Sequence, residues 1–351
     1  MMPSPNCYLL PAVSIVESNL VSGPPDAENQ VYDSGATYDT GDEVWDGGHV
    51  FRSKIDSNTD DTSVTASWDD LGEVDLGADA WTAGTYALDV YKVRNSRLWK
   101  SAKASNTDTP GEAPLTSWTD FGPTNRHKVF DLFLNRLSLQ KGSISWEITI
   151  PSRVTFALIM VPRGGSVRVV SRRPTTDEVV FDKTFLATRD SGGGMYRYFF
   201  SPIDQVSNII VPDLGPYSGN TFEVTITGNE TALVGAGQIV FGFAEALGTV
   251  TTGGYLGFES FNQVEFDDFG NPSFTNGLKR RTIGFPLQGD VLQNDRIYNA
   301  LAKQNNRPTA VVMRDGGPYG LAAFGLLREF YTRMPNTVLS ETLIEIEGFA
   351  E

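Results

Sequence analysis

The chain has 351 residues, of which 40% are hydrophobic and 11% aromatic, the composition of a folded protein with room for two or three compact domains. Its formal net charge of −15 argues against a nucleic-acid partner, because phosphate binding depends on clustered Lys and Arg. The apolar runs have the length of strands and fall short of the roughly 20 residues that span a bilayer, so we expect no membrane insertion. The single cysteine, Cys7, rules out an internal disulfide and suits a reducing cytoplasm.

The first 40 residues contain five prolines together with Gly and Ser, a composition typical of an extended segment. We expect residues 1–40 to form an N-terminal arm with a single strand over residues 8–16. Such an arm suits a role in wrapping a neighbouring protein. The start of the chain lacks the basic and long apolar segments of a signal peptide, so we expect no export by that route.

A repeated motif dominates the next 80 residues. Residues 51–60 and 99–108 both begin with an aromatic side chain and end in Ser-Asn-Thr-Asp, and residues 67–72 and 117–122 both have the pattern Ser-Trp-x-Asp-apolar-Gly. The repetition predicts two copies of one small module. We place these copies at residues 41–83 and 84–123. Each copy is too small to be stable through a hydrophobic core alone, so we expect contacts with the other copy or with the rest of the protein to stabilise it.

Short runs of alternating apolar and polar residues follow, separated by Gly, Pro and Asn. This alternation predicts antiparallel strands, so we expect a jelly-roll-like β-sandwich at residues 124–248. In the C-terminal domain, at residues 249–351, the apolar spacing predicts one packed helix over about residues 290–305, with Asp290 as its N-cap. Further strands are expected at residues 309–313, 320–331 and 343–347. The expected fold is therefore mainly β.

Two resemblances to known families rest on these motifs. The repeats, with the opening Tyr-Asp-Thr-Gly-Asp-Glu-Val at residues 38–44, resemble the small chitin-binding modules of carbohydrate-binding families 5 and 12. The second copy departs from this pattern, because residues 86–93 lack the Gly-Asp pair. The resemblance implies a small β module that contacts glycan through aromatic side chains.

The second resemblance covers about residues 40–351. This part of the chain is similar to structural proteins of tailed-phage tail tips. The similarity rests on residues 118–131, on the sandwich that follows, and on a C-terminal region with Phe-Asp-Asp-Phe-Gly-Asn at 266–271 and Gly-Leu-Lys-Arg-Arg at 277–281. His127 stands where that family has an aromatic residue. The resemblance implies a non-enzymatic virion protein of the tail tip, baseplate or fibre attachment complex, assembled in the host cytoplasm. Its implied partners are other tail proteins, copies of itself and host-surface glycan.

The aromatic side chains of the repeats divide into two groups. Those at equivalent positions are expected to form the small cores, because aromatics supply the largest buried area per residue. The core candidates are Phe51, Trp68 and Trp118, and the glycan-contact candidates are Trp45, Trp81, Tyr91 and Trp99. Trp81 has no aromatic equivalent in the aligned copies, and Trp45 matches Tyr91 only across a two-residue gap.

The sequence predicts no catalytic, cofactor or metal site. Adjacent acids at residues 60–61, 69–70 and 267–268 invite a glycosidase interpretation, which needs two carboxyl groups at a set separation. In a chain with 43 acidic residues such pairs arise by chance, and we expect them to face solvent. His49 and His127 are the only histidines, too few for a zinc site, and no nucleophile motif accompanies them.

The Ser-Asn-Thr-Asp segment has a second interpretation. Asp56, Asn58 and Asp60 place oxygen ligands at alternate positions, as calcium prefers. The same residue types are good turn formers, and the segment lacks the Gly and distal Glu of an EF-hand, so we favour a turn.

Two alternative functions stay open at this point. The chain could be a free carbohydrate-binding protein or adhesin that recognises a cell-surface polysaccharide, which a stable monomer with an exposed aromatic row would favour. A polysaccharide-degrading enzyme with appended binding modules would instead need two acids that converge in a cleft.

Overall fold

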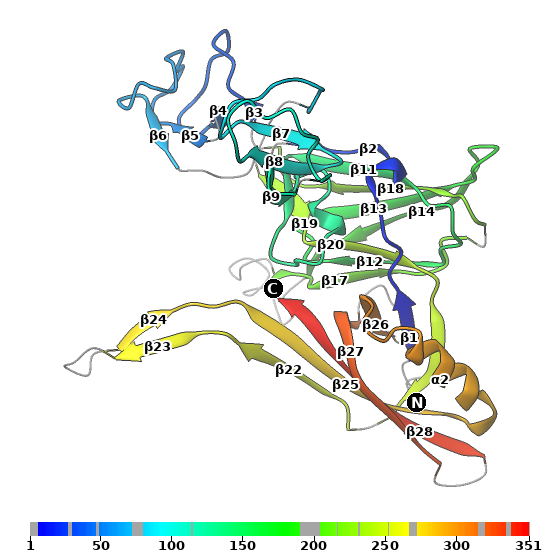
Figure 1. The fold of residues 1–351 in the computed structure, drawn as a ribbon. Helices are drawn as coiled ribbons and strands as arrows, with labels where there is room; N and C mark the ends of the chain where they lie inside the picture. The colour runs from blue at the N-terminus through cyan, green and yellow to red at the C-terminus, as the bar shows by residue number, and fades with distance from the viewer. Residues whose placement is uncertain are drawn as a thin grey trace, which may run out of the picture.

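The computed structural model describes residues 6–26, 30–46, 49–71, 80–113, 115–189, 204–215, 217–230, 232–251, 253–266, 272–314, 320–334 and 338–350. The protein is mainly β, as the sequence predicts. Its body consists of stacked β-sheets, from which two small modules and one long β-ribbon project (Figure 1). Within the described ranges, no helix has both the length and the apolar character needed to cross a membrane.

The C-terminal unit is a six-stranded antiparallel sheet that closes on itself. The strands follow the order β21, β1, β26, β27, β28 and β25, and β21 also pairs with β25. Their bounds are Asn6–Pro11 for β1, Glu245–Val250 for β21, Lys279–Asp290 for β25, Thr309–Arg314 for β26, Leu321–Arg333 for β27 and Leu339–Ala350 for β28. Leu9, Phe285 and Ile344 belong to the core of this closed sheet.

One short helix packs against the closed-sheet core. The helix α2 (Asn294–Ala302) buries Ile297, Ala300 and Leu301, the face that the apolar spacing predicts. It follows the 3-10 turn η3 (Val291–Gln293), where Asp290 Oδ1 accepts a hydrogen bond from the Leu292 N–H at 2.9 Å. Asp290 therefore caps the 3-10 turn that leads into the helix, whereas the N-cap position of α2 itself is Gln293, which makes no side-chain cap hydrogen bond. The helix is shorter than the expected span of 290–305 because the chain passes into tighter turns after Ala302.

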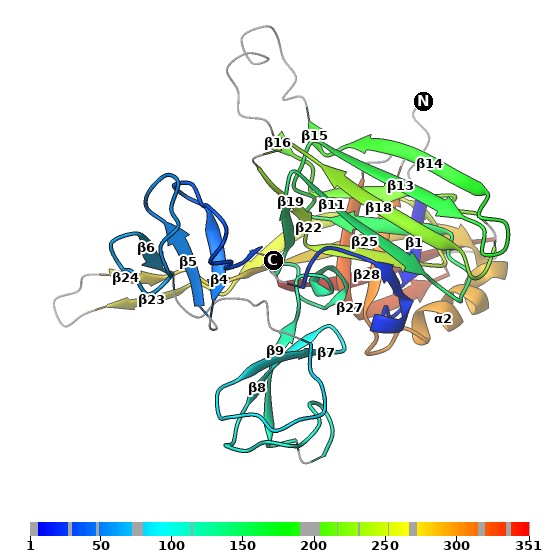
Figure 2. The same cartoon turned by 90° about the horizontal axis from the view of Figure 1, so that it is seen from above.

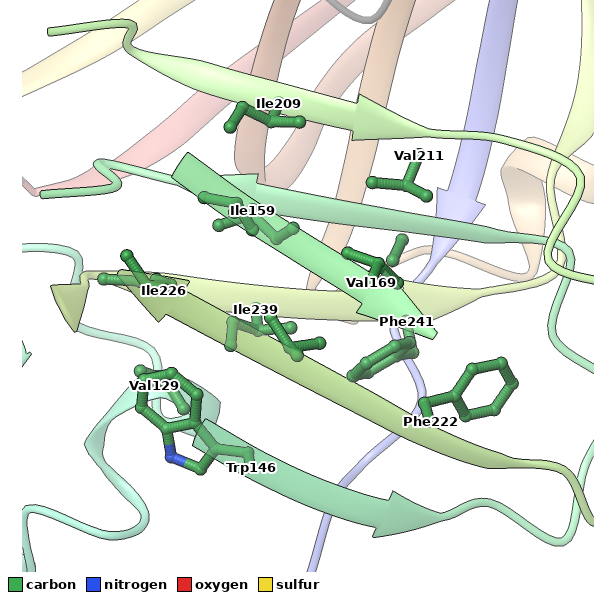
Figure 3. Packing of buried hydrophobic residues seen from close by; sticks show 14 of the residues in the cluster. Val129, Trp146, Ile159, Val169, Ile209, Val211, Phe222, Ile226, Ile239 and Phe241 are labelled. Carbon is green, nitrogen blue, oxygen red and sulfur yellow. The ribbon is translucent and has the colours of Figure 1, made fainter. Parts of the chain in front are cut away.

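Two further sheets form the predicted sandwich. The first has the order β14 (Val179–Leu186), β13 (Ser166–Arg172), β18 (Thr221–Thr227), β11 (Ser143–Thr149) and β2 (Leu20–Ser22), and the second has the order β17 (Asn208–Val211), β12 (Phe156–Met160) and β20 (Gln238–Gly242). Side chains from both sheets meet between them, including Trp146, Phe222 and Phe241 (Figure 3). Two short pairs complete this region, β10 (Ser138–Lys141) with β19 (Leu233–Ala236) and β15 (Thr188–Arg189) with β16 (Asp204–Gln205).

The three-stranded sheet is buried on both faces. Ile159 and its neighbours on one face pack into the sandwich core, whereas Leu158 and Val240 on the other face pack against Val312 and Phe324 of the closed sheet. All five residues of β12 are buried, which explains its uninterrupted apolar sequence. The body is therefore a stack of a five-stranded sheet, a three-stranded sheet and the closed sheet.

The N-terminal segment departs from the expected arm. Its first described residues form β1, which lies between β21 and β26 and completely buries Cys7 and Leu9. After the turn η1 (Glu17–Asn19), β2 completes the five-stranded sheet by pairing with β11. The expectation of an arm that wraps a neighbour is therefore wrong for residues 6–26, which join two sheets of their own chain.

The two repeats form separate lobes outside the body (Figure 2). Module 1 contains β3 (Gln30–Val31), β4 (Glu43–Asp46), β5 (His49–Ser53) and β6 (Trp68–Asp70), and module 2 contains β7 (Tyr91–Arg94), β8 (Arg97–Ser101) and β9 (Trp118–Pro123). Module 1 begins earlier than the expected residue 41, because Tyr32 and Ala36 pack on its core. Module 2 begins before the expected residue 84, because Ala80 bridges to Val93.

The ribbon continues the closed sheet beyond its core. It consists of β22 (Tyr255–Ser260), the outer half of β25, and the hairpin of β23 (Gln263–Phe266) with β24 (Pro272–Thr275). The last short element is the 3-10 turn η2 (Lys128–Phe130), which follows module 2.

Candidate functional site on the repeated modules

A buried asparagine organises each module. Asn58 and Asn106 have no exposed surface, and both come from the Ser-Asn-Thr-Asp motif. Asn106 Nδ2 donates to Ser101 Oγ at 3.1 Å and to the Ser117 carbonyl at 2.7 Å, while its Oδ1 accepts from the Asp108 N–H at 3.1 Å. Asn58 makes the three corresponding bonds in module 1, at 3.0, 3.1 and 3.0 Å. The motif therefore closes a turn over the end of each small sheet.

The next motif places one tryptophan in each core. Trp68 and Trp118 are 2% and 4% exposed. Their Nε1 atoms donate to the carbonyls of Asp60 and Asp108, at 2.9 and 2.8 Å. Each tryptophan ring meets a tyrosine ring edge to face. The ring centres are 5.3 Å apart for Trp68 and Tyr38 in module 1 and 5.6 Å apart for Trp118 and Tyr86 in module 2. Phe51, the third core candidate, is half-buried and packs against the core of module 1.

The aspartates of the motif also serve this turn. Ser67 Oγ donates to Asp60, and Ser117 Oγ donates to Asp108 in the same way. The ammonium of Lys103, 2.6 Å from Asp108, and the Ser117 hydroxyl hold the pKa of the Asp108 carboxyl below its ordinary value. Of the residues considered for calcium, Asn58 and Asp60 thus accept hydrogen bonds within the turn, and Asp56 accepts one from the Thr40 N–H at 3.1 Å.

Strand register corrects the alignment of the candidate aromatics. Phe51 and Trp99 are equivalent residues of the repeated motif. Val44 lies opposite Phe51, and Lys92 lies opposite Trp99, so Val44 and Lys92 are equivalent as well. Trp45 therefore corresponds to Val93, and Tyr91 corresponds to Glu43. Trp45 lies in β4 opposite Val50, and its side chain is outside the described residues.

Trp81 has an aromatic equivalent after all. Ala80 forms a parallel bridge to Val93, as Val31 does to Trp45 in β3 and β4. The residue that follows is Trp81 in module 2 and Tyr32 in module 1. The sequence comparison misses this match because the two copies are offset by 49 residues here and by 48 or 50 elsewhere.

Trp81 and Trp99 are half-buried and already engaged within module 2. The guanidinium of Arg94 lies 5.5 Å from the centre of the Trp81 ring and donates to the Pro110 carbonyl at 2.5 Å and to Glu112 at 2.7 Å. Trp99 Nε1 donates to the Arg94 carbonyl at 3.3 Å, and Gly111 lies against the Trp99 ring, where a Cβ atom would come within 3.1 Å of it. These contacts make both tryptophans part of one structural cluster.

Tyr91 is also half-buried but belongs to a different group, on the face of the sheet opposite Trp99. Its ring meets Phe121 edge to face at 5.5 Å, and Lys100 Nζ lies 5.1 Å from the centre of the Tyr91 ring. Lys100 also lies 3.4 Å from Asp89, and Phe121 is 41% exposed. We call Asp89, Tyr91, Lys100 and Phe121 the Tyr91 patch. It combines aromatic surfaces with one cation and one anion.

Among the described residues of module 1, the equivalent positions carry no aromatic patch. The positions of Tyr91 and Lys100 hold Glu43 and Arg52, which form an ion pair at 2.6 Å, and the position of Phe121 holds Leu71. Sequence reasoning named Tyr91 but missed Phe121. The signal was available in the motif itself, whose apolar position before Gly is Leu in one copy and Phe in the other.

The remaining candidate groups make structural contacts. Asp69 pairs with Lys54 at 2.6 Å, and Asp70 lies 3.0 Å from His49 Nδ1. His127 meets Phe130 edge to face at 5.4 Å, and burial lowers the pKa of its imidazole. The acid pair at 267–268 lies outside the described residues.

Thr124 and Asn125 join module 2 to the body. Both are buried, and the Thr124 N–H donates to the Ser96 carbonyl in module 2 at 2.8 Å. Thr124 Oγ1 donates to Asp26 at 2.6 Å, and the Asn125 N–H donates to the Asp26 carbonyl at 2.9 Å. The Asn125 amide exchanges two 2.8 Å hydrogen bonds with the backbone of Leu139 in the sandwich. The Gly-Pro-Thr-Asn-Arg motif thus forms a joint between module 2, the N-terminal segment and the sandwich.

Comparisons of the chain with protein-family models, with curated proteins and with solved structures found no match.

Proposed function

We propose that this chain is a non-enzymatic structural protein of a tailed-phage virion, at the tail tip, baseplate or fibre attachment complex. In this role the stacked sheets form a rigid body that docks neighbouring tail proteins. Module 2 touches host-surface glycan through the Tyr91 patch.

The joint at Thr124 and Asn125 is the observation that carries the structural part of this proposal. The motif at residues 122–126 carries the resemblance to tail-tip proteins, and here it makes a chemically specific connection between three segments. Because its polar groups are buried and hydrogen-bonded, the joint holds module 2 in a set orientation to the body. A module with a set orientation suits a scaffold that presents one surface outward.

The Tyr91 patch supports the glycan part. Sugar rings offer apolar C–H faces that stack on aromatic rings, while their hydroxyl groups need donors and acceptors nearby. Tyr91 and Phe121 supply the rings, and Lys100 and Asp89 supply the polar groups at the edge. Trp81 and Trp99 are less suited, because the Arg94 guanidinium covers the Trp81 ring, while Trp99 Nε1 donates to the Arg94 carbonyl and its ring lies against Gly111.

A glycan array with the full chain tests this assignment. We expect Tyr91→Ala and Phe121→Ala each to weaken binding of the recognised glycan about 5- to 30-fold, as loss of a stacked aromatic costs on the order of 1–2 kcal/mol. Leu71→Ala, at the position of Phe121 in module 1, is the matched control and should leave binding unchanged. Wild-type chain that binds no glycan on the array would refute the glycan contact and leave the structural role standing.

The structural role has a separate test. An antibody raised against the chain should label one end of the tail in purified virions of the source phage, seen by immunogold electron microscopy. Absence of the chain from purified virions, together with glycan binding by a stable monomer, would instead support the alternative of a free adhesin. The Tyr91 patch is the observation that favours that second candidate.

A further inference from the structure

A pocket opens between the three-stranded sheet and the closed sheet, beside the outer strand β20. Its volume is about 460 Å³, within the ~300–1,000 Å³ typical of small-molecule sites. Its walls come from the N-terminal segment 11–15, the end of η2 with Leu132, β20, and the turn 304–308 after α2. Phe324 of β27 also lines it, so both the sandwich side and the closed sheet contribute to the pocket.

The N-terminal wall of the pocket is held in place by hydrogen bonds to both sheets. Thr309 Oγ1 donates to the Leu10 carbonyl at 3.1 Å, and the Val13 N–H donates to the Phe241 carbonyl at 2.8 Å. Between these two bonds the chain leaves the closed sheet and runs toward β2 in the sandwich (Figure 1). Because its backbone is fixed at both ends, this wall is preformed in the folded chain.

Most of the pocket lining is apolar. Val240 and Phe324 belong to the core between the three-stranded sheet and the closed sheet, and Ile15 and Ile239 belong to the sandwich core. Leu132, which is 43% exposed, adds an apolar side chain nearer to solvent. Such a lining suits the apolar body of a ligand, because binding removes apolar surface of both from water.

Two buried amides interrupt this apolar lining. Gln238 precedes Val240 by two residues in β20, so both side chains lie on the face of the strand toward the closed sheet. Gln304 lies in the turn after α2. Gln238 is 3% exposed and Gln304 is 7% exposed, and neither amide has a hydrogen-bond partner among the described residues. Because buried polar groups nearly always have partners, the two amides indicate a hydrogen-bonding group on a ligand.

The exposed part of the pocket lining carries a cation. Arg307 is exposed, and its guanidinium makes no ion pair or hydrogen bond within the described part of the chain. Ser14, also exposed, adds a hydroxyl donor. The described residues that line the pocket include no carboxylate. In a chain with a net charge of −15, such a cation favours an anionic group on the ligand.

We propose that this pocket binds a small amphipathic anion. The apolar body of the ligand lies against Val240 and Phe324, and a hydroxyl, carbonyl or amide group of the ligand bonds to Gln238 or Gln304. The anionic group pairs with Arg307 where the pocket meets solvent. A bound ligand therefore contacts both sheets and stabilises their packing. This inference does not depend on the proposed virion role or on glycan binding.

Two fluorescent probes test the pocket in the full chain. Anilinonaphthalene sulfonate has an apolar body and an anionic group, and phenylnaphthylamine has the same aromatic body without the charge. We expect each probe to saturate at about one molecule per chain. Arg307→Glu should weaken binding of the sulfonate about tenfold or more and change binding of the neutral probe by less than about twofold, because only the sulfonate loses a charged contact.

Two further variants fill the pocket from different walls. Gln304→Trp and Ala12→Trp each place a large ring in it, so each should abolish binding of both probes. The control is a ribbon variant, Phe258→Ser with Phe274→Ser, which removes two exposed rings outside the pocket and should bind both probes as the wild type does. A circular dichroism melting curve close to that of the wild type identifies the variants that fold.

The comparison of probes and variants can overturn the proposal at each step. Wild-type chain without saturable binding of either probe would show that the pocket takes no such ligand. Binding that persists in a folded Gln304→Trp or Ala12→Trp variant, or that is lost in the ribbon variant, would place the probes elsewhere on the chain. Sulfonate binding that Arg307→Glu leaves unchanged, or an equal loss of both probes, would contradict an anionic ligand at Arg307.

Discussion

The buried asparagine of module 2 gives the sharpest test of how these modules are stabilised. Asn106→Ala removes three hydrogen bonds from a site with no exposed surface. The Ser117 carbonyl keeps a second donor, the Ala102 N–H at 3.0 Å, and the Ser101 hydroxyl still donates to the Lys103 carbonyl at 2.9 Å. The Asp108 N–H loses the acceptor that Asn106 provides.

The expected cost follows from this unequal loss. A buried group left without its partner costs about 1–3 kcal/mol, and a hydrogen bond whose other partner stays satisfied costs about 1 kcal/mol. With one orphaned N–H and two such hydrogen bonds, these terms lower the free energy of unfolding of module 2 by at least about 3 kcal/mol. For a module of this size such a loss is a large part of its stability.

Hydrogen exchange measured by mass spectrometry reads this loss locally. A loss of 3 kcal/mol should accelerate exchange about 100-fold in peptides covering residues 86–118. Peptides covering β11 in the sandwich should exchange at the wild-type rate, because that sheet has its own core. Thr107→Ala, at the exposed neighbour of Asn106, is the control. Asn58→Ala should have the same effect in module 1.

Two results would refute this reasoning. An acceleration below about threefold with Asn106→Ala would mean that the turn hydrogen bonds do not hold the module together. Equal acceleration in β11 would mean that module 2 and the sandwich unfold as one unit.

Three further predictions concern the body. Burial raises the pKa of Asp131 to about 6, so ionisation of its carboxyl group lowers the free energy of unfolding. This loss is absent below about pH 4 and grows as the pH rises through 6. Asp131→Asn keeps an acceptor for the Phe133 N–H. It should raise the free energy of unfolding by about 1–2 kcal/mol at pH 8 and leave it unchanged at pH 3.5. An equal effect at both pH values in urea titrations would contradict this. Cys7 is completely buried, and burial raises the pKa of its thiol. A thiol reagent should therefore label Cys7 only as fast as the closed sheet unfolds. Fast labelling of the native chain would argue against that burial. Gly325→Ala would place a Cβ atom 1.8 Å from a backbone oxygen of β28 and should lower the free energy of unfolding by about 3 kcal/mol. Gly257→Ala is the control, because its Cβ atom would meet no atom within 4 Å. Equal urea midpoints for the two variants would contradict the register of β27 and β28.

The local pattern of the sequence determined much of the secondary structure. Period-2 alternation located the strands of the sandwich, and the apolar spacing with Asp290 located the helix, because side-chain periodicity follows directly from backbone geometry. The repeat of Ser-Asn-Thr-Asp and Ser-Trp predicted two modules of one design. These signals are contained in segments of ten to twenty residues, so one sequence is enough to interpret them.

The tertiary structure alone decided which segments meet. The N-terminal residues looked like a free arm, yet Thr309 Oγ1 donates to the Leu10 carbonyl across 299 positions of sequence, inside the closed sheet. A strand that lacks alternation, such as β12, does not reveal which two layers will cover its faces.

The candidate site shows the same division. Tyr91 was recognisable as an aromatic, but its neighbour Phe121 and its true equivalent, Glu43, emerged only from strand register. Insertions of one or two residues shift a linear alignment, whereas backbone pairing keeps equivalent positions opposite one another. Periodicity within a segment is set by local geometry, and the pairing of distant segments is set by which combination buries the most apolar surface and satisfies the most hydrogen bonds.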